Sequence, residues 1–292
     1  MGSKRDSPVG AVSPPTGGGS APSVPPTISY SQLSRFDECG YRWYLERVVG
    51  LPQREGDGYA DDSRGARARG TLTHRLLETL TFKDPEELPS LDSIEALARG
   101  VDGAMSDRSS LVEQQQMLEV FVACDLWREL KEADKVEKES NFALEIVSKD
   151  QTLPVLIGTI DVLAELGSGR FLVVDYKTDR VGPNEDLAVK VENRYSLQRD
   201  AYALSALRRG ASEVEVVYSF LERPSERVSV VFDASQEPQL VSRLEAAARK
   251  LTGSEFPVSD RPNSGLCTGC PGRPVKNAAG LCSHSEAETS RK

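Results

Sequence analysis

The feature that most constrains this chain is the segment IGTIDVLAELGSGRFLVVDYKTDR, which occupies residues 157–180. Two runs of apolar and β-branched residues flank a Gly-Ser-Gly sequence, a pattern typical of a β-hairpin. Both runs nevertheless contain charged residues, Asp161 in the first and Asp175 and Lys177 in the second. Charged side chains are rarely buried without a partner, so these three positions need a specific physical reason.

The hairpin turn determines which of these residues face one another. A tight turn at residues 167–170 pairs positions whose numbers sum to about 336, which places Asp161 opposite Asp175 or its neighbour. Opposed residues in an antiparallel pair lie about 4.5–5.5 Å apart. Lys177 follows Asp175 by two residues and therefore projects from the same face of the strand. The sequence predicts two carboxylates and one ammonium group converging on one point.

Two interpretations fit this cluster of charges. The first is a surface salt bridge on a solvated strand face. The second is a metal site, because two like charges about 4 Å apart repel each other by roughly 4 kcal/mol at an effective dielectric of about 20. A divalent cation offsets that repulsion better than one lysine does. Ligation by carboxylate oxygens suits Mg²⁺ or Mn²⁺, so the pattern favours a site for one of these ions.

The segments GTIDVLAEL and FLVVDYKT resemble the core of the PD-(D/E)XK nuclease superfamily, specifically the RecB-type domains of helicase–nucleases and CRISPR-associated nucleases. Val174 stands at the variable proline position of that motif. The resemblance implies that Asp161, Asp175 and the carbonyl oxygen of Tyr176 ligate the metal. On the same basis, Lys177 orients or activates the attacking water. The implied chemistry is metal-assisted hydrolysis of a phosphodiester bond.

Two further segments follow in the family's order. GTLTHRLLE resembles the first RecB-type motif, which implies that His74 reaches the metal, although a lone helical histidine is more often a surface or packing residue. YSLQRDAYALSAL resembles the Q-x-x-x-Y motif, with Gln198 and Tyr202 one helical turn apart. These two side chains are expected to bind phosphate or to orient the catalytic lysine and the metal ligands. Without the other motifs, an ordinary amphipathic helix would be the preferred interpretation.

Arginines close to these motifs are candidate contacts to the DNA backbone. Each of them, taken alone, is more often a solvated surface residue. The candidates lie around the histidine segment and beside the glutamine: Arg64, Arg67, Arg69, Arg75, Arg194 and Arg199.

Four cysteines form a pattern typical of a metal site. Cys267 and Cys270 make a C-x-x-C pair in a stretch rich in Pro and Gly, Cys282 follows them, and Cys39 lies far upstream. In the AddB-like subgroup of RecB-type domains with this layout, the cysteines bind a [4Fe–4S] cluster, so the resemblance implies such a cluster here. The long spacing from Cys270 to Cys282 leaves Zn²⁺ as the alternative. Cys124 is expected to be a buried free thiol.

The remaining periodicities predict an α/β fold. Helices are expected after Ser31 as N-cap, from about residue 71, and across residues 84–135. The period then changes to two. Strands are expected at about residues 141–148, 154–166, 171–177, 214–220 and 227–232, with helices at 195–209 and 236–252. This order predicts a mixed central sheet flanked by helices, with a helical insertion, and the resemblance implies a restriction-endonuclease-like core.

Composition predicts how the chain is divided. Residues 1–27 consist almost entirely of Gly, Pro, Ser, Ala, Val and Thr, so a flexible leader or linker is expected. Residues 28–292 are assigned to one nuclease domain. Its expected parts are a helical region at 28–140, an α/β core at 141–252 and a cysteine-rich loop at 253–292.

Charge and hydropathy exclude several classes of protein. The chain has 292 residues and a net charge of −9, which argues against a wholly basic protein that coats nucleic acid. It contains no apolar run long enough to cross a bilayer and no block resembling a secretion signal, so a cytoplasmic protein without a membrane partner is expected. A G-x-x-x-x-G-K-[ST] phosphate loop is absent, which predicts that the chain itself does not hydrolyse ATP.

Together these patterns predict a DNA nuclease, an exonuclease acting on single strands or duplex ends in recombination or repair. A helicase subunit or domain is then the expected partner for unwinding. One alternative is a nuclease-like module that grips DNA and mainly supports a helicase. Another is a zinc-containing regulator.

Overall fold

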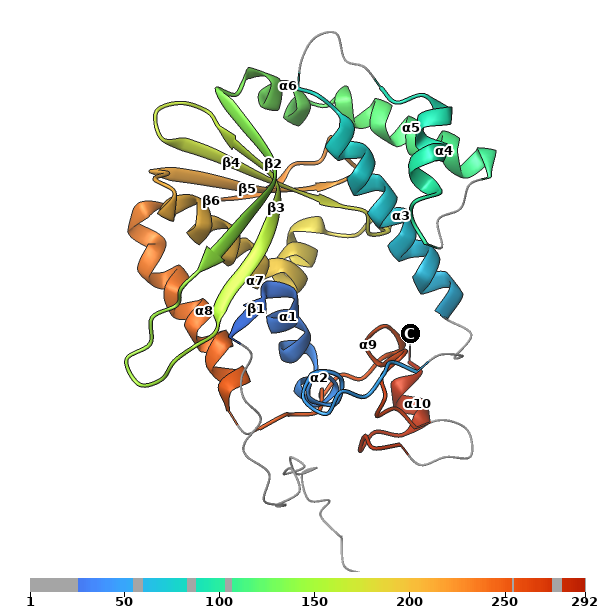
Figure 1. The fold of residues 1–292 in the computed structure, drawn as a ribbon, viewed down its shortest axis with the longest axis vertical. Coiled ribbons are helices and arrows are strands. Elements are labelled where there is room, and N and C mark those ends of the chain that lie inside the picture. The colour runs from blue at the N-terminus through green and yellow to red at the C-terminus, as the bar shows by residue number, and fades with distance from the viewer. Residues whose placement is uncertain are drawn as a thin grey trace, which may run out of the picture. The chain divides into compact units, whose positions relative to one another are not determined.

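The computed structural model describes residues 26–54, 60–82, 88–102, 107–253, 255–274 and 280–291, without the side chains of residues 60–64. The elements are β1 (Thr27–Ser29), α1 (Tyr30–Glu38), α2 (Gly40–Arg47), α3 (Ala60–Thr79), α4 (Leu91–Ala98), α5 (Arg108–Val122), α6 (Asp125–Glu132), β2 (Lys135–Leu144), β3 (Val155–Glu165), β4 (Arg170–Lys177), α7 (Leu187–Arg208), β5 (Glu213–Phe220), β6 (Val228–Asp233), the 3₁₀ turn η1 (Ala234–Gln236), α8 (Glu237–Thr252), α9 (Ser264–Cys267) and α10 (Glu286–Thr289). A run of helices, α1 to α6, precedes strands β2 to β4 in the described chain, and α7 then separates these strands from β5 and β6 (Figure 1).

The chain forms two compact units, each built from segments that are distant in sequence. Unit 1 comprises Met1–Ala60, Ser148–Pro154 and Ala246–Lys292, and unit 2 comprises Asp61–Val147 and Val155–Glu245. The expected division into a helical region, an α/β core and a cysteine-rich loop follows chain order instead, and it stays a prediction. Within the described residues, no helix has the length and apolar character that crossing a bilayer requires.

Unit 2 is organised around a mixed sheet in which the strand order is β2–β3–β4–β5–β6. The β4–β5 pair is parallel, whereas β2–β3, β3–β4 and β5–β6 are antiparallel. Parallel neighbours need a long crossover, and α7 provides it between β4 and β5. This arrangement confirms the predicted α/β fold with a mixed central sheet flanked by helices.

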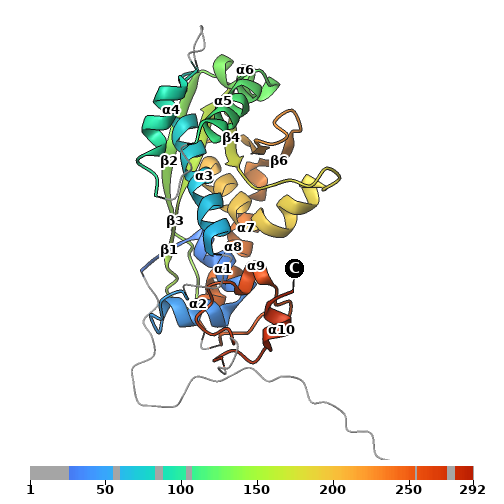
Figure 2. The ribbon, with the colours of Figure 1, turned by 90° about the vertical axis from the view of Figure 1, so that its right-hand side faces the viewer.

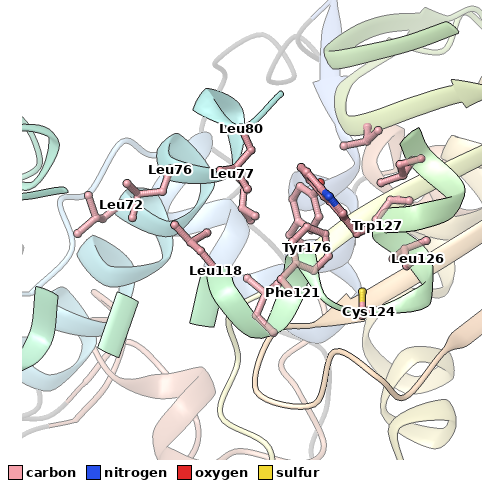
Figure 3. Close-up of a cluster of buried hydrophobic side chains, with 14 of the residues drawn as sticks. Leu72, Leu76, Leu77, Leu80, Leu118, Phe121, Cys124, Leu126, Trp127 and Tyr176 are labelled. Carbon is pink, nitrogen blue, oxygen red and sulfur yellow. The ribbon is translucent and has the colours of Figure 1, made fainter. Parts of the chain in front are cut away.

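Both faces of this sheet are covered by helices. On one face, side chains of β3, β4 and β5 join a buried apolar cluster with α3, α4, α5 and α6. Figure 3 shows part of this cluster, with Leu72, Leu76 and Leu77 of α3 near Leu118 and Phe121 of α5. Helices α4, α5 and α6 lie together at one end of unit 2 (Figures 1 and 2). On the other face, α7 packs against β2, β4, β5 and β6.

The β3–β4 hairpin has the register expected from its turn. Val162 pairs with Val174, so the residue numbers sum to the predicted value. Gly167 and Gly169 make this turn with φ angles of 80° and 75°, which glycine adopts without steric cost. The ladder ends at the Val162–Val174 pair, so Asp161 lies just beyond it, where the two strands separate.

Ser29 caps the first helix, whereas the sequence had indicated Ser31. The Ser29 hydroxyl accepts a hydrogen bond from the Gln32 amide at 3.3 Å, and the Gln32 side chain accepts one from the Ser29 amide at 3.0 Å. This reciprocal cap satisfies two backbone donors at once. The helix stops at Cys39, whose extended backbone (φ −160°, ψ 96°) separates α1 from α2.

Helix α3 begins at Ala60, well before residue 71, where the sequence had suggested a start. The additional residues are rich in Arg and Ala, which are strong helix formers, and two glycines do not interrupt them. Gly70 has a packing role in this helix. A Cβ atom there would lie 2.9 Å from Oγ1 of Thr178, so glycine allows α3 to approach the end of β4 closely.

The region expected to be helical at residues 84–135 contains three separate described helices, α4, α5 and α6, and β2 already begins at Lys135. The polar first half of β2 conceals the strand in the sequence. Lys135 faces Glu165 across the β2–β3 ladder, with Nζ 3.3 Å from the carboxylate. Lys138 Nζ donates to the carbonyl oxygen of Glu78 at 2.9 Å. Such partners stabilise a strand that shows no apolar alternation.

Candidate active site

Asp161 lies at the separating ends of β3 and β4. Its Oδ2 accepts a hydrogen bond from the backbone amide of Tyr176 at 2.7 Å, in place of the next ladder bond. Its Oδ1 lies 3.6 Å from Nδ1 of His74, which α3 carries to the same point. The structure thus brings together Asp161, His74 and the main chain of Tyr176, which the sequence had placed in one site.

The two side chains nearest this point have perturbed protonation equilibria. Burial raises the pKa of Asp161 well above its ordinary value, and the neighbouring Asp175 raises it further. Burial lowers the pKa of His74, which outweighs the opposing effect of Asp175. The imidazole of His74 is therefore neutral at neutral pH, which is the form that ligates metal ions.

Sequence reasoning missed Glu139 of β2 at this site. The ligand atoms of His74, Glu139 and Asp161 all lie within 4.8 Å of one another, and among the described residues they form the one such group of three. Glu139 has a φ angle of 47°, which is uncommon for a residue other than glycine and interrupts the β2–β3 pairing opposite Asp161. No periodicity in the sequence marks this distortion, so no local signal identifies Glu139.

Asp175 forms the second half of the site. Its Oδ1 accepts a hydrogen bond from Nε2 of Gln198 at 2.8 Å and lies 3.1 Å from the hydroxyl of Tyr202. Its Oδ2 is buried and lies 2.6 Å from Nζ of Lys177, an ion-pair distance, so the ammonium group neutralises this oxygen.

Gln198 and Tyr202 hold Asp175 and Lys177 in these positions. They project from the same face of α7, one helical turn apart, as the sequence pattern predicted. Oε1 of Gln198 accepts a hydrogen bond from Lys177 Nζ at 3.0 Å, and the Tyr202 hydroxyl donates to the carbonyl oxygen of Thr159 at 2.9 Å. One amide therefore contacts both the acid and the amine.

The donor set of this site fits a hard divalent cation. It offers carboxylate oxygens from Glu139 and Asp161 together with the neutral imidazole of His74, within 4.8 Å of one another. Oxygen-rich sets of this kind suit Mg²⁺ and Mn²⁺, whereas thiolates select softer metals. Nucleases of the PD-(D/E)XK type use divalent metals, and His74, Glu139 and Asp161 offer ligand atoms suited to such an ion.

The arginines proposed to contact DNA differ in their surroundings. Arg67 and Arg75 are exposed on α3, Arg69 is half-buried, and Nη1 of Arg75 donates to the carbonyl oxygen of Gly100 at 2.9 Å. Arg194 is 55% exposed in its side chain and lies 3.7 Å from Asp179. The side chain of Arg64 lies outside the described part of the chain. Those four described arginines stay candidates for phosphate contacts.

Arg199 has different surroundings from the other candidates, and its contact with DNA stays a prediction. Its side chain is only 11% exposed, and its guanidinium donates to Glu192 at 2.5 Å and to Asp200 at 3.4 Å. The guanidinium also lies 5.8 Å from the ring centre of Phe232. Because Asp200 is buried and also paired with Arg243 at 2.6 Å, Arg199 belongs to an ion-pair network that joins the buried Asp200 to the exposed Glu192.

Unit 1 carries the four cysteines. Cys39, Cys267, Cys270 and Cys282 line one pocket, which also contains Arg42, Arg273 and His284. A backbone contact holds the chain after α2 against the segment that contains Cys267 and Cys270. The backbone amide of Arg54 donates a hydrogen bond to the carbonyl oxygen of Gly269 at 3.0 Å. No three of the cysteine sulfur atoms, within the residues described for unit 1, approach within 4.8 Å of one another. Cys124 is buried in the unit 2 core, as expected for a free thiol.

Proteins similar to this chain include helicase–nuclease subunits. An ATP-dependent helicase/nuclease subunit of Desulforamulus reducens is 28% identical over 191 residues, which are 60% of this chain and 14% of that protein. The corresponding protein from Lysinibacillus sphaericus is 28% identical over 124 residues, covering 41% of this chain and 9% of that protein. This chain thus corresponds to a small part of each relative's length. The AddB-like assignment stays a prediction.

A solved structure shares the fold. A candidate exonuclease from Eubacterium rectale superposes with a TM-score of 0.50 at 12% identity, covering 88% of this chain and 91% of that chain. The model of the PD-(D/E)XK nuclease superfamily matches residues 27–275, a range that contains both acids of the β3–β4 hairpin, the lysine and the α7 pair. By this match over most of its length, the chain belongs to the PD-(D/E)XK nuclease superfamily.

Proposed function

We propose that this chain is a metal-dependent deoxyribonuclease that hydrolyses phosphodiester bonds as an exonuclease in DNA recombination or repair. The observation that carries the proposal is the pairing of two preformed groups. One is the His74, Glu139 and Asp161 cluster, and the other is Asp175 with its contact to Lys177. A module that only binds DNA needs neither a cluster of possible metal ligands nor a lysine held against a buried carboxylate.

Each residue has a distinct role in this proposal. His74, Glu139, Asp161 and Asp175 hold Mg²⁺ or Mn²⁺ with the carbonyl oxygen of Tyr176, and the ion supplies Lewis-acid stabilisation of charge on the phosphate. Lys177 places a positive charge beside the same carboxylate and helps to neutralise the scissile phosphate.

Gln198 orients Asp175 and Lys177 through its amide hydrogen bonds, and the Tyr202 hydroxyl accepts a further bond from the same amide at 3.0 Å. Holding reacting groups in fixed positions before substrate arrives lowers the cost of reaching the transition state. The two α7 side chains are therefore proposed to contribute through geometry.

The substrate and partner follow from the relatives and from the charge distribution. Similar proteins are named helicase/nuclease subunits, which supports DNA as the substrate and a helicase subunit or domain as the partner. The exposed α3 arginines and Arg194 are proposed to contact backbone phosphates of single strands or duplex ends.

Digestion of DNA labelled at its ends tests the nuclease proposal. We expect cutting that requires Mg²⁺ or Mn²⁺ and that falls at least about 100-fold in Asp175→Asn, while DNA binding is retained. Asp125→Asn, whose side chain is 88% exposed in unit 2, is the matched control and should cut normally. A closed circular substrate distinguishes end-dependent from internal cutting. Retained DNA binding without cutting in the intact protein, with either metal, would support the structural-module alternative.

We also propose that the four cysteines of unit 1 bind a [4Fe–4S] cluster, with Zn²⁺ as the alternative. Their placement around one pocket supports a shared ligand. Zn–S bonds of about 2.3 Å in a tetrahedron place sulfur atoms roughly 3.8 Å apart. Four thiolate ligands suit either occupant, and metal analysis of the purified protein distinguishes iron from zinc.

A further inference from the structure

The surroundings of Lys177 contain one feature that the contacts described above do not explain. Its Nζ reaches Asp175 and Gln198 on one side. On another side lie two aromatic rings, with Nζ 4.0 Å from the ring centre of Tyr195 and 5.4 Å from that of Tyr218. Both distances are within the roughly 6 Å at which an aromatic face attracts a cation.

The two rings are fixed by the elements that carry them. Tyr195 precedes Gln198 by one turn of α7, and Tyr218 lies beside Asp175 in the parallel β4–β5 register. The rings stack with centres 5.6 Å apart and an interplanar angle of 22°. The Tyr218 hydroxyl donates to the carbonyl oxygen of Tyr195 at 3.1 Å.

The hydroxyl of Tyr195 is also fixed. It donates to Oδ2 of Asp179 at 2.6 Å. Burial raises the pKa of Tyr195, and the bond to Asp179 raises it further, so the phenol stays protonated and acts as a donor. Ordinary core packing would account for the stacked rings. It would not account for an ammonium group against the face of one of them, because an apolar side chain would fill that space without the cost of desolvating a charge.

We propose that Tyr195, supported by Tyr218, is a positioning residue that holds the Lys177 ammonium group against Asp175 and Gln198. A lysine side chain has four rotatable bonds, and ordering it costs conformational entropy. The ring face closes one side of the space around Nζ, so fewer lysine conformations remain. The catalytic consequence rests on the proposed nuclease function, whereas the ring–ammonium contact does not depend on activity.

Nuclear magnetic resonance of lysine-labelled full-length protein tests the contact itself. The ring face should shift the Lys177 ε-methylene signal upfield, and Lys177→Arg assigns that signal by removing it. We expect the shift in the wild type and in Tyr195→Phe, which keeps the ring. We expect it to become much smaller in Tyr195→Leu, in which only the more distant Tyr218 ring remains. An unshifted signal in the wild type, or an unchanged shift in Tyr195→Leu, would overturn the proposal.

Steady-state digestion with Mn²⁺ tests the consequence for catalysis. Tyr195→Leu should lower kcat about tenfold with KM unchanged, and Tyr195→Phe should restore most of the rate. Equal rates in the two variants would contradict a positioning role. If Tyr195→Leu does not fold, Tyr195→Met provides the same comparison with an unbranched side chain.

The two measurements separate two kinds of failure. A wild-type protein that cuts no DNA contradicts the nuclease proposal, yet its lysine signal still decides whether Tyr195 holds Lys177. A wild-type protein that cuts DNA but shows no shifted lysine signal supports the nuclease proposal and rejects the role of Tyr195.

Discussion

Glu139 brings a third carboxylate to a site that already contains two. Its side chain is exposed, but partial desolvation raises its pKa, and the nearby Glu78 raises it further. Its positive φ angle costs energy that persists only where surrounding contacts impose it. Three carboxylates held close together repel one another when no cation is present. A divalent ion would offset this repulsion and stabilise the arrangement.

Removing the charge of Glu139 should weaken metal binding. We expect Glu139→Gln to bind Mn²⁺ about 10- to 100-fold more weakly than the wild type, as measured by isothermal titration calorimetry. Glu145→Gln, just beyond the end of β2 and exposed, is the control and should bind with unchanged affinity. Equal affinities for all three proteins would show that Glu139 is a bystander.

Metal binding should strengthen as the pH rises. The pKa of Asp161 is raised, so its carboxyl keeps a proton above the usual range, whereas the lowered pKa of His74 leaves the ring already neutral at neutral pH. Binding must therefore displace a proton from Asp161, and affinity increases until the pH exceeds the folded-state pKa of that group. Calorimetry in two buffers of different ionisation enthalpy measures the released protons. Affinity independent of pH would contradict this expectation.

At the scale of elements, the position of the histidine depends on how closely α3 approaches β4. Gly70 makes that approach against Thr178, which directly follows Lys177, and His74 lies one turn further along the helix. The same helix contains Gly65, where an added Cβ would meet nothing within 4 Å. These two glycines separate the effect of helix propensity from the effect of close packing.

Alanine substitutions at the two positions should have opposite outcomes. Gly65→Ala should raise stability by up to about 1 kcal/mol, because alanine favours helix over glycine. Gly70→Ala gains the same propensity but pushes α3 away from β4, so Mn²⁺ affinity should fall at least about tenfold. Thermal denaturation and calorimetry report the two effects. Unchanged affinity in Gly70→Ala would mean that Thr178 rotates to make room.

The features predicted correctly are those determined by residues that lie close together in the sequence. The β3–β4 register follows from one short turn, and the Gln198 and Tyr202 pair follows from helical spacing. The early start of β2 could not be seen, because its strand is stabilised by partners distant in sequence such as Glu78. Tyr195 could not be singled out, since a tyrosine on an amphipathic helix looks like ordinary core.

At the scale of the whole molecule, unit 1 collects segments from widely separated parts of the sequence. Its helices α1 and α2 are short, and the pocket lined by its cysteines lies where these segments meet. Small units of this kind commonly need a metal or a disulfide for stability, because their apolar core is small. Burial raises the pKa of Cys267, Cys270 and Cys282, so the thiols stay protonated unless the proposed metal or cluster stabilises their thiolates.

Replacing one of these cysteines should remove the occupant of unit 1. We expect anaerobically purified wild type to contain iron, or zinc on the alternative, and Cys270→Ser to lose it and to become sensitive to proteases within unit 1. Cys124→Ser, in the core of unit 2, should keep the wild-type metal content. Metal analysis and limited proteolysis check both variants. A wild-type protein without iron or zinc would contradict the cofactor proposal.

The discontinuous make-up of unit 1 has a consequence for biosynthesis. Cys39 emerges from the ribosome long before Cys282, so the pocket cannot form around it until all of unit 2 has been translated. A cofactor could then be inserted into this pocket only after the last cysteine has been translated. A product terminated before Cys282 would leave α1 and α2, which are rich in aromatic residues, without part of their packing partners. Chaperones and proteases recognise exposed apolar surface of this kind.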